Sequence, residues 1–145
     1  MKIEQLSIKE YEEVLNLWKK TELSVGSSDT KKQVKRMIER NPNLCLVGKL
    51  NVKTVAVVLG AFDGRRGYVH HLAVDPDYQR KRYGSMLMAE LMKRFKKIKV
   101  HKVHLFIEKR NQDVIKFYKE IGWTFRDDLV MMSYVPDKEL YKMRI

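Results

Sequence analysis

The chain has 145 residues, of which 44% are hydrophobic and 33% are charged, and this composition excludes intrinsic disorder. Thirty Lys and Arg against 18 Asp and Glu give a formal net charge of +12. Such a charge attracts nucleic acid, an anionic membrane or a phosphorylated cofactor, and it is equally compatible with a well-solvated surface. The length predicts one domain over residues 1–145.

Cysteine usage and hydropathy indicate the compartment. A single cysteine, Cys45, cannot form a disulfide within the chain, so nothing indicates an oxidising environment. The longest apolar run, residues 55–62, is much shorter than the roughly 20 residues that span a bilayer. The first residues, MKIEQLS, lack the apolar core of a signal peptide. We therefore expect a cytoplasmic protein without a membrane segment.

The first third of the chain predicts a strand followed by two helices. Ser7 and Glu10 have the spacing of a capping box, which satisfies free amides at a helix start. Apolar residues then follow at helical spacing, at Tyr11, Val14, Leu15 and Trp18. After the polar stretch 21–30, a second helix carries Val34, Met37 and Ile38. It ends at Asn41-Pro42, because the residue before a proline disfavours the helical region.

The remaining elements alternate between strands and helices. Strands are predicted over residues 43–50, 54–62, 68–74 and 103–107, helices over 84–97 and 111–121, and closing strands over 123–125 and 130–135. The order predicts a mixed α/β fold, with a largely antiparallel first half and crossover helices in the second half.

The junction between the strand 68–74 and the helix 84–97 is the most informative segment. The free amides and the dipole of a helix N-terminus form an anion site. Arg80, Lys81 and Arg82 add three cationic side chains to the same loop. A phosphate site is the direct expectation, and a solvated basic turn is the alternative.

Two further segments carry candidate chemistry. Asn111 is a good helix cap, and Tyr118 on the apolar stripe of the helix 111–121 is either a core residue or a proton donor. The basic stretch 93–102 favours a solvated helix end, with nucleic-acid binding as the alternative. The sequence shows no aromatic platform for stacking bases on a strand face, so nucleic acid is the weaker interpretation.

Together these segments resemble the GNAT superfamily of acetyltransferases, which move an acetyl group from acetyl-CoA to an amine. The matching features are Leu72-Ala73-Val74 with Asp75-Pro76, the loop Gln79-x-x-Arg82-x-Gly84, and Asn111-x-x-Val114-x-x-x-Tyr118 ending in Gly122-Trp123. The resemblance covers nearly the whole chain. It implies a single-domain GNAT-like fold, with a central mixed sheet of six to seven strands flanked by about four helices.

The resemblance also implies roles for individual residues. Leu72 N–H would stabilise the negative charge on the thioester oxygen, and Tyr118 would protonate the departing CoA thiolate, in a direct transfer through a tetrahedral intermediate. The implied acetyl-CoA contacts are Leu72, Ala73, Val74, Gln79, Arg80, Lys81, Arg82, Tyr83, Gly84, Ser85, Asn111 and Tyr118. No metal is implied, and Cys45 is expected to be a buried small hydrophobic residue rather than an acetyl carrier.

The sequence departs from the family pattern at two positions. Arg82 stands where the family usually has the first loop glycine, and a positive φ there would add strain. Phe106 stands where the N-terminal acetyltransferases for ribosomal proteins have a glutamate base. Strand alternation puts Tyr68, His70 and Leu72 on one face and His71 on the other. We expect His70 to be the base, with Glu108 as the weaker alternative.

The acceptor amine stays open at this stage. The resemblance implies that the region 22–29, the side chains of Tyr68 and His70, and the segment after Trp123 select it. A peptide N-terminus, a protein lysine, an aminoglycoside and a small metabolite are all compatible, whereas a polycation such as spermidine would meet a protein of like charge. A CoA-binding protein without catalysis is a further alternative, and either a monomer or a homodimer fits.

Overall fold

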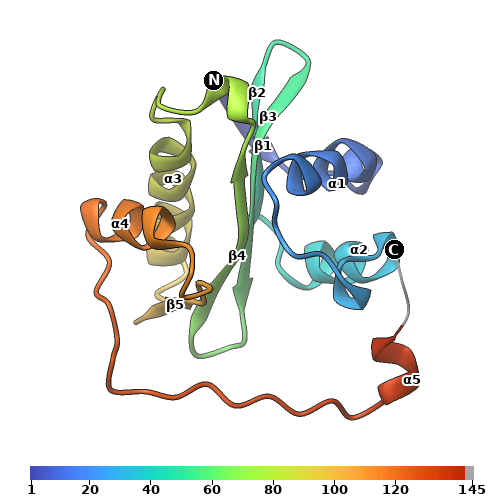
Figure 1. Cartoon of the computed structure of the whole chain (residues 1–145). Coiled ribbons are helices and arrows are strands. Elements are labelled where there is room, and N and C mark those ends of the chain that lie inside the picture. The colour runs from blue at the N-terminus through green and yellow to red at the C-terminus, as the bar shows by residue number, and fades with distance from the viewer. Residues whose placement is uncertain (143–145) are drawn as a thin grey trace.

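A central sheet organises the molecule (Figure 1). The computed structural model describes residues 1–142, so the last three residues of the expected domain lie outside it. The sheet has five strands in sequence order: β1 (Lys2–Gln5), β2 (Cys45–Leu50), β3 (Lys53–Phe62), β4 (Gly67–Val74) and β5 (Val103–Leu105). Strands β1 to β4 are antiparallel, and β5 runs parallel to β4. The predicted antiparallel first half with a later crossover is confirmed.

Helices cover both faces of the sheet (Figure 1). On one face lie α1 (Tyr11–Lys20) and α2 (Lys31–Arg40), and on the other lie α3 (Tyr83–Lys97) and α4 (Gln112–Glu120). Single 3-10 turns occur at η1 (Ile8–Glu10), η2 (Ser27–Asp29) and η3 (Pro76–Tyr78), and a short α5 (Lys138–Tyr141) follows an extended segment. Each face has its own apolar cluster, one built on α1 and one on α3. The predicted mixed α/β fold class is confirmed.

The predicted capping box forms at the start of η1, which leads directly into α1. The Ser7 hydroxyl accepts a hydrogen bond from the Lys9 amide at 3.3 Å, and the Ser7 amide donates to Glu10 Oε1 at 3.0 Å. These bonds satisfy amides that the first turn leaves free. All four apolar residues predicted on this helix are buried: Tyr11, Val14, Leu15 and Trp18. Burial of this stripe fixes α1 on the sheet.

The predicted closing strands are not formed, so the sheet has five strands rather than six or seven. Among the described residues, neither 123–125 nor 130–135 pairs with another strand. The chain after α4 runs extended to α5 instead (Figure 1). An apolar stretch becomes a strand only where a partner edge accepts its backbone groups. The strand predicted over 103–107 also ends earlier, at Leu105.

None of the helices within residues 1–142 is long and apolar enough to cross a membrane.

Candidate functional site

A β-bulge in β4 shapes the centre of the site. Val57 of β3 pairs with Ala73, but Leu59 pairs with His70, so His71 and Leu72 oppose a single residue of β3. His71 takes the extra length in a left-handed conformation, with φ at 53°. For a residue with a side chain, this conformation costs about 1–2 kcal/mol. Bulges of this kind re-aim side chains and interrupt the hydrogen-bonded ladder.

The bulge overturns the predicted alternation along β4. Leu72 packs into the apolar cluster of α3, together with Val69. His71 instead lies against Trp18 of α1, with ring centroids 5.0 Å apart. The expectation that Leu72 shares a face with Tyr68 and His70, and that His71 lies opposite, is therefore wrong. A strict period of two holds only where no residue is inserted.

Polar contacts from the α1 side brace the bulge. Trp18 Nε1 donates to the His71 carbonyl at 3.3 Å, and His71 Nε2 lies 2.9 Å from Asp29 Oδ1. The Gly26 amide donates to Asp29 Oδ2 at 3.0 Å, and the Tyr11 hydroxyl donates to the Asp29 carbonyl at 2.7 Å. Burial alone would raise the pKa of Asp29, but the hydrogen bonds from His71 and Gly26 outweigh it, so the pKa is lowered. Asp29 is therefore a carboxylate that is already engaged.

Beyond the bulge, β4 has a free edge. Pairing with β5 covers only Gly67, Tyr68 and Val69, because β5 ends at Leu105, the partner of Val69. Within the described part of the chain, the β5 side of the stretch 72–74 has no strand partner. The backbone groups of an unpaired strand edge can bind an extended ligand as an added strand.

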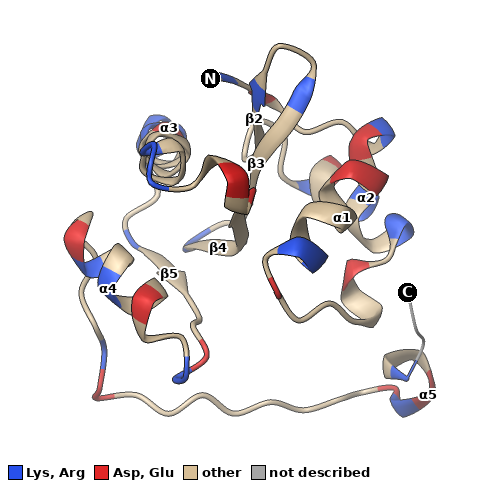
Figure 2. Cartoon of the chain, turned by 45° about the horizontal axis from the view of Figure 1, so that its top comes forward, with Lys and Arg blue, Asp and Glu red and all other residues tan. Residues whose placement is uncertain are grey.

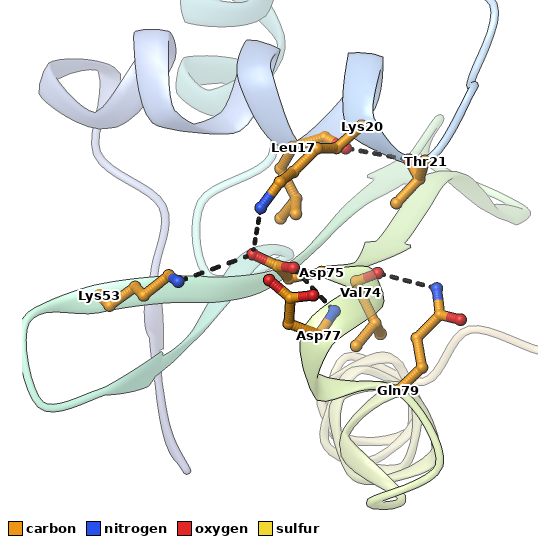
Figure 3. Close-up of polar contacts among 8 residues, drawn as sticks. All are labelled: Leu17, Lys20, Thr21, Lys53, Val74, Asp75, Asp77 and Gln79. Atoms are coloured by element: carbon orange, nitrogen blue, oxygen red, sulfur yellow. Dashed lines mark hydrogen bonds and ion pairs between the residues drawn. The ribbon is translucent and has the colours of Figure 1, made fainter.

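The turn after β4 is held by Asp75, which is only 2% exposed. Its carboxylate accepts from the Asp77 amide at 3.0 Å and from Lys20 Nζ at 3.0 Å, with Lys53 Nζ at 3.9 Å (Figure 3). Burial alone would raise the pKa of Asp75, but the bonds from Asp77 and Lys20 lower it overall. Gln79 Nε2 donates to the Val74 carbonyl at 3.1 Å (Figure 3). The loop therefore leaves β4 in a fixed direction.

The loop before α3 has an unusual backbone. Arg80 and Arg82 both adopt left-handed conformations, with φ at 63° and 64°. Arg82 caps α3 without a side-chain hydrogen bond. The amides of the first helical turn, from Tyr83 to Ser85, have no partner within the helix, and the helix dipole makes this end positive. Figure 2 shows Lys and Arg in the loop that leads into α3.

Gly84 shows how closely three elements converge here. A Cβ atom at Gly84 would lie 3.4 Å from Val74 of β4 and 3.5 Å from Phe117 of α4. The end of β4, the start of α3 and one face of α4 therefore meet at a single point. The loop and the free strand edge are parts of one surface.

Helix α4 places Tyr118 near the point where β4, α3 and α4 meet. The side chain is 7% exposed and belongs to the same apolar cluster as Leu72 and Val74. Its ring lies 5.1 Å from Phe117 and 5.5 Å from Trp123. Burial raises the pKa of the Tyr118 phenol, so this group stays protonated at neutral pH. Its hydroxyl makes no hydrogen bond to another described residue. Asn111, at the start of α4, is exposed and makes no side-chain cap bond.

The candidate proton acceptors differ in their surroundings. The His70 ring is partly buried and stacks on Tyr68 at 6.4 Å. Burial lowers the pKa of His70, the neighbouring His71 lowers it further and Asp29 opposes the shift. Glu108 is engaged instead, with its carboxylate 2.7 Å from Arg110 Nε and 3.1 Å from the Ser24 hydroxyl. Phe106 is 61% exposed and has no group that accepts a proton.

Cys45 is placed as expected. It is fully buried in β2, and its Sγ lies 3.6 Å from the Gly60 carbonyl oxygen. Burial raises the pKa of this thiol to about 11. It therefore offers neither access nor a thiolate for carrying an acyl group.

Comparison of the sequence with profiles of known families assigns the chain to a family. The profile of the Acetyltransferase (GNAT) family matches residues 11–123, from the start of α1 to the residue packed on Tyr118. The chain belongs to the GNAT acetyltransferase family. Its members bind acetyl-CoA and an acceptor, so the protein is an acyltransferase with a CoA-type cosubstrate.

Relatives of the GNAT protein extend over most of its length. An acetyltransferase of Sodalis glossinidius is 27% identical over 124 residues, covering 86% of this chain and 87% of its own. An acetyltransferase of Pectobacterium atrosepticum is 28% identical over 131 residues, covering 90% and 93%. Both names agree with the family.

Solved structures agree on the fold. Ard1 from Thermoplasma volcanium superposes with a TM-score of 0.79 at 21% identity, covering 86% of this chain and 83% of its own. The PaiA N-acetyltransferase from Thermoplasma acidophilum, solved in complex with coenzyme A, gives a TM-score of 0.77 at 19% identity, with coverages of 87% and 91%.

The sequence-predicted site residues fall into two groups in the structure. Leu72, Val74, Gly84 and Tyr118 lie on the α3 and α4 side of β4. Ala73 packs in the cluster of α1, and His70 lies on that side as well. Sequence reasoning missed Trp18 and His71 as braces of the bulge. The contacts that reveal them join residues 42 and 53 positions apart, so no local motif carries the signal.

Proposed function

We propose that this protein is an N-acetyltransferase that moves the acetyl group of acetyl-CoA to a primary amine. The observation that carries the proposal is the meeting of a free strand edge, a helix N-terminus preceded by three cationic side chains, and the buried phenol of Tyr118. An acyl donor with a pyrophosphate and an extended arm fits these three features in one pose.

The loop side supplies binding. The amides from Arg80 to Ser85 face the position of the pyrophosphate, and the side chains of Arg80, Lys81 and Arg82 add charge around it. The backbone of 72–74 pairs with the pantetheine arm along the free edge of β4. Asn111 and Gln79 flank this path. Asn111 has an exposed side chain, whereas Gln79 already bonds the Val74 carbonyl.

The chemistry divides among three groups. His70 takes a proton from the amine, directly or through water, and its lowered pKa keeps the ring neutral for this purpose. The amine nitrogen then bonds to the thioester carbon, and the amide of Leu72 stabilises the charge on the carbonyl oxygen. The carbon–sulfur bond breaks, and Tyr118 donates its proton to the departing thiolate.

The acceptor reaches this centre from the α1 and α2 side. His70 stacks on Tyr68 there, and Glu22 is an exposed carboxylate on the neighbouring loop. Asp29 is already paired with His71, so Glu22 and the ring of Tyr68 are the groups left to attract and orient an amine. The acceptor is a singly charged primary amine rather than a polycation, because the net charge of +12 repels the latter.

The test measures thiol release from acetyl-CoA against a panel of amines. The buried Cys45 gives little background in a thiol assay. Amine-dependent release is expected, and Tyr118→Phe is expected to lower kcat by about 100-fold. The stability of this variant should change little, because the Tyr118 hydroxyl makes no hydrogen bond within the described chain.

Tyr11→Phe is the matched control. Tyr11 is 5% exposed, close to the 7% of Tyr118, but its hydroxyl donates to Asp29. The control should lose about 1 kcal/mol of stability and keep most of its kcat. Equal rate losses in both variants would remove Tyr118 as the acid. Saturable binding of acetyl-CoA without release for any amine would favour a binding protein without catalysis.

A further inference from the structure

One end of the molecule carries cations that the proposed acetyl transfer does not use. Residues 93–102, which form the end of α3 and the connector to β5, hold six Lys and Arg and no Asp or Glu. Lys96, Lys97, Lys99 and Lys102 are all exposed. Taken alone, this stretch is compatible with a solvated helix end, because cations near a helix C-terminus complement its dipole.

The fold brings a second cationic segment to the same end. The turn between β3 and β4 carries Arg65 and Arg66. The Gly67 amide donates to the Lys102 carbonyl at 3.0 Å, and a Cβ atom at Gly67 would lie 2.9 Å from Phe95 of α3. Figure 1 shows this turn beside the end of α3. We call the cations that these two segments bring together the basic end: Arg65, Arg66, Lys96, Lys97, Lys99 and Lys102.

The charge of the basic end is not balanced within the described chain. None of its side chains forms an ion pair with an acid in residues 1–142. Burial lowers the pKa of His104, and the charges of Lys102 and Arg66 lower it further, so both segments act on one place. Neighbouring acids are engaged already: Asp63 accepts from the amides of its own turn at 2.7 Å, Glu90 lies 3.9 Å from Arg94, and Asp128 lies 2.8 Å from Arg126.

The backbone at Lys99 is a second observation. The Lys99 amide donates to the Lys96 carbonyl at 3.0 Å, and the Val100 amide donates to the Phe95 carbonyl at 3.1 Å. These two bonds form a Schellman motif, which places Lys99 in the left-handed region, with φ at 63°. Glycine is the usual residue at this position, because it adopts a positive φ without strain. The chain therefore keeps a cation where glycine would be less strained.

We propose that the basic end binds the phosphate backbone of a nucleic acid without reading its bases. Duplex DNA carries one negative charge per about 1.7 Å of its axis, so it can neutralise several neighbouring cations at once. Phosphate contacts need no aromatic platform for stacking bases, and the sequence shows none on a strand face. A protein partner would need an apolar centre, whereas Ile98, at 45%, is the only exposed large apolar side chain within residues 63–67 and 93–102.

The basic end lies away from the loop assigned to acetyl-CoA. The loop 79–85 leads into the start of α3, whereas the basic end surrounds the end of this helix (Figure 1). A helix of 15 residues is about 22 Å long. Nucleic acid and CoA would therefore occupy separate ends of α3, and nucleic-acid binding does not depend on the proposed acetyl transfer.

The test is the fluorescence anisotropy of a labelled DNA duplex of mixed sequence, titrated with the full chain between about 50 and 200 mM salt. The logarithm of the affinity should fall with the logarithm of the salt concentration, by about 0.9 for each phosphate that a cation neutralises. The triple variant Arg65→Gln, Lys99→Gln and Lys102→Gln should lower this slope by about 3 and weaken binding at low salt by about tenfold or more. All three side chains are exposed, so the variant should fold.

A triple variant of α2 is the matched control. Lys31→Gln, Lys32→Gln and Arg36→Gln remove the same charge from exposed positions on the other face of the sheet. This variant should bind the duplex as the native chain does. Equal losses in the two triple variants would show that net charge alone attracts the duplex, and they would overturn the proposal, as would a native chain that does not bind.

Competition distinguishes the basic end from other sites and partners. Saturating CoA should leave duplex binding unchanged, whereas displacement by CoA would place the duplex on the loop 79–85 and overturn the proposal. Polyglutamate and vesicles containing phosphatidylserine, each supplied at the same total charge, should compete poorly. Competition by either one as strong as that of unlabelled duplex would replace nucleic acid with an acidic protein or a membrane as the partner.

Discussion

Both faces of β4 pack against an apolar cluster, but only one of them adds polar contacts to the bulge. On the α3 and α4 face, Leu72 and Val74 pack into an apolar cluster with Tyr118. On the α1 face, polar contacts from Trp18 and Asp29 to His71 also hold the bulge. Apolar packing tolerates small shifts, whereas hydrogen bonds fix direction. We therefore propose that the apolar face provides the wall that binds the cosubstrate and that the polar contacts set the direction of the proton acceptor, His70.

The largest effect is expected for His70, on the α1 face of β4. His70→Gln should lower kcat/KM for the amine by about 100-fold and leave acetyl-CoA binding unchanged, because it removes only the base. In the native protein the rate should fall at acid pH. The midpoint should lie below 6.5, because burial lowers the pKa of His70 and the ring stays neutral above it. This fall in rate at acid pH, the acid limb of the pH profile, should be absent in His70→Gln.

His104→Gln is the control for that profile. Burial also lowers the pKa of His104, and its ring lies 5.9 Å from Tyr68, but it stands on β5. The variant should keep the acid limb. Loss of the limb in His104→Gln rather than in His70→Gln would move the base to β5 and break the assignment of the two faces.

The next largest effect concerns Asp75, which ties the turn after β4 to Lys20 of α1. Asp75→Ala should lower the free energy of unfolding by about 2 kcal/mol at neutral pH, since it loses the bonds from Asp77 and Lys20. The pKa of Asp75 is lowered in the folded state, so this contribution is present above the ordinary aspartate pKa of about 3.9 and is lost as the pH falls through the lower folded value.

Urea unfolding near neutral pH and near pH 3 measures this loss. Asp77→Ala is the neighbouring control and should cost less than about 0.5 kcal/mol, because its exposed carboxylate caps nothing. A penalty for Asp75→Ala that stays constant into acid would show that packing, rather than the carboxylate, holds the turn.

The smallest effect is expected at Arg82, where two variants distinguish backbone strain from the charge of the side chain. Both Arg82→Ala and Arg82→Gly remove a cation and should weaken acetyl-CoA binding a few-fold. Only the glycine variant relieves the positive φ, so it should be more stable than the alanine variant by about 1 kcal/mol. Calorimetric binding and thermal unfolding of the pair measure both. Equal stabilities would mean that the loop carries no backbone strain.

The same contrast explains what the sequence could predict. The loop 79–85 was predicted from a strand-to-helix junction with three basic residues, whereas the role of Tyr118 was implied only by the family resemblance. The bulge at His71 depends on Trp18 and Asp29, which are distant in the chain. Alternation therefore misplaced Leu72. The predicted strand 130–135 has the right composition, but strand formation depends on a partner edge that no local pattern specifies.

The most direct measurement of the central claim is hydrogen–deuterium exchange of the native chain with and without CoA. The account predicts slower exchange at residues 72–74 and 79–85, where free backbone amides receive the ligand, and little change over 18–29 on the opposite face. Protection confined to the basic stretch 93–102, or no protection, would contradict the placement of the cosubstrate on the α3 and α4 side of β4.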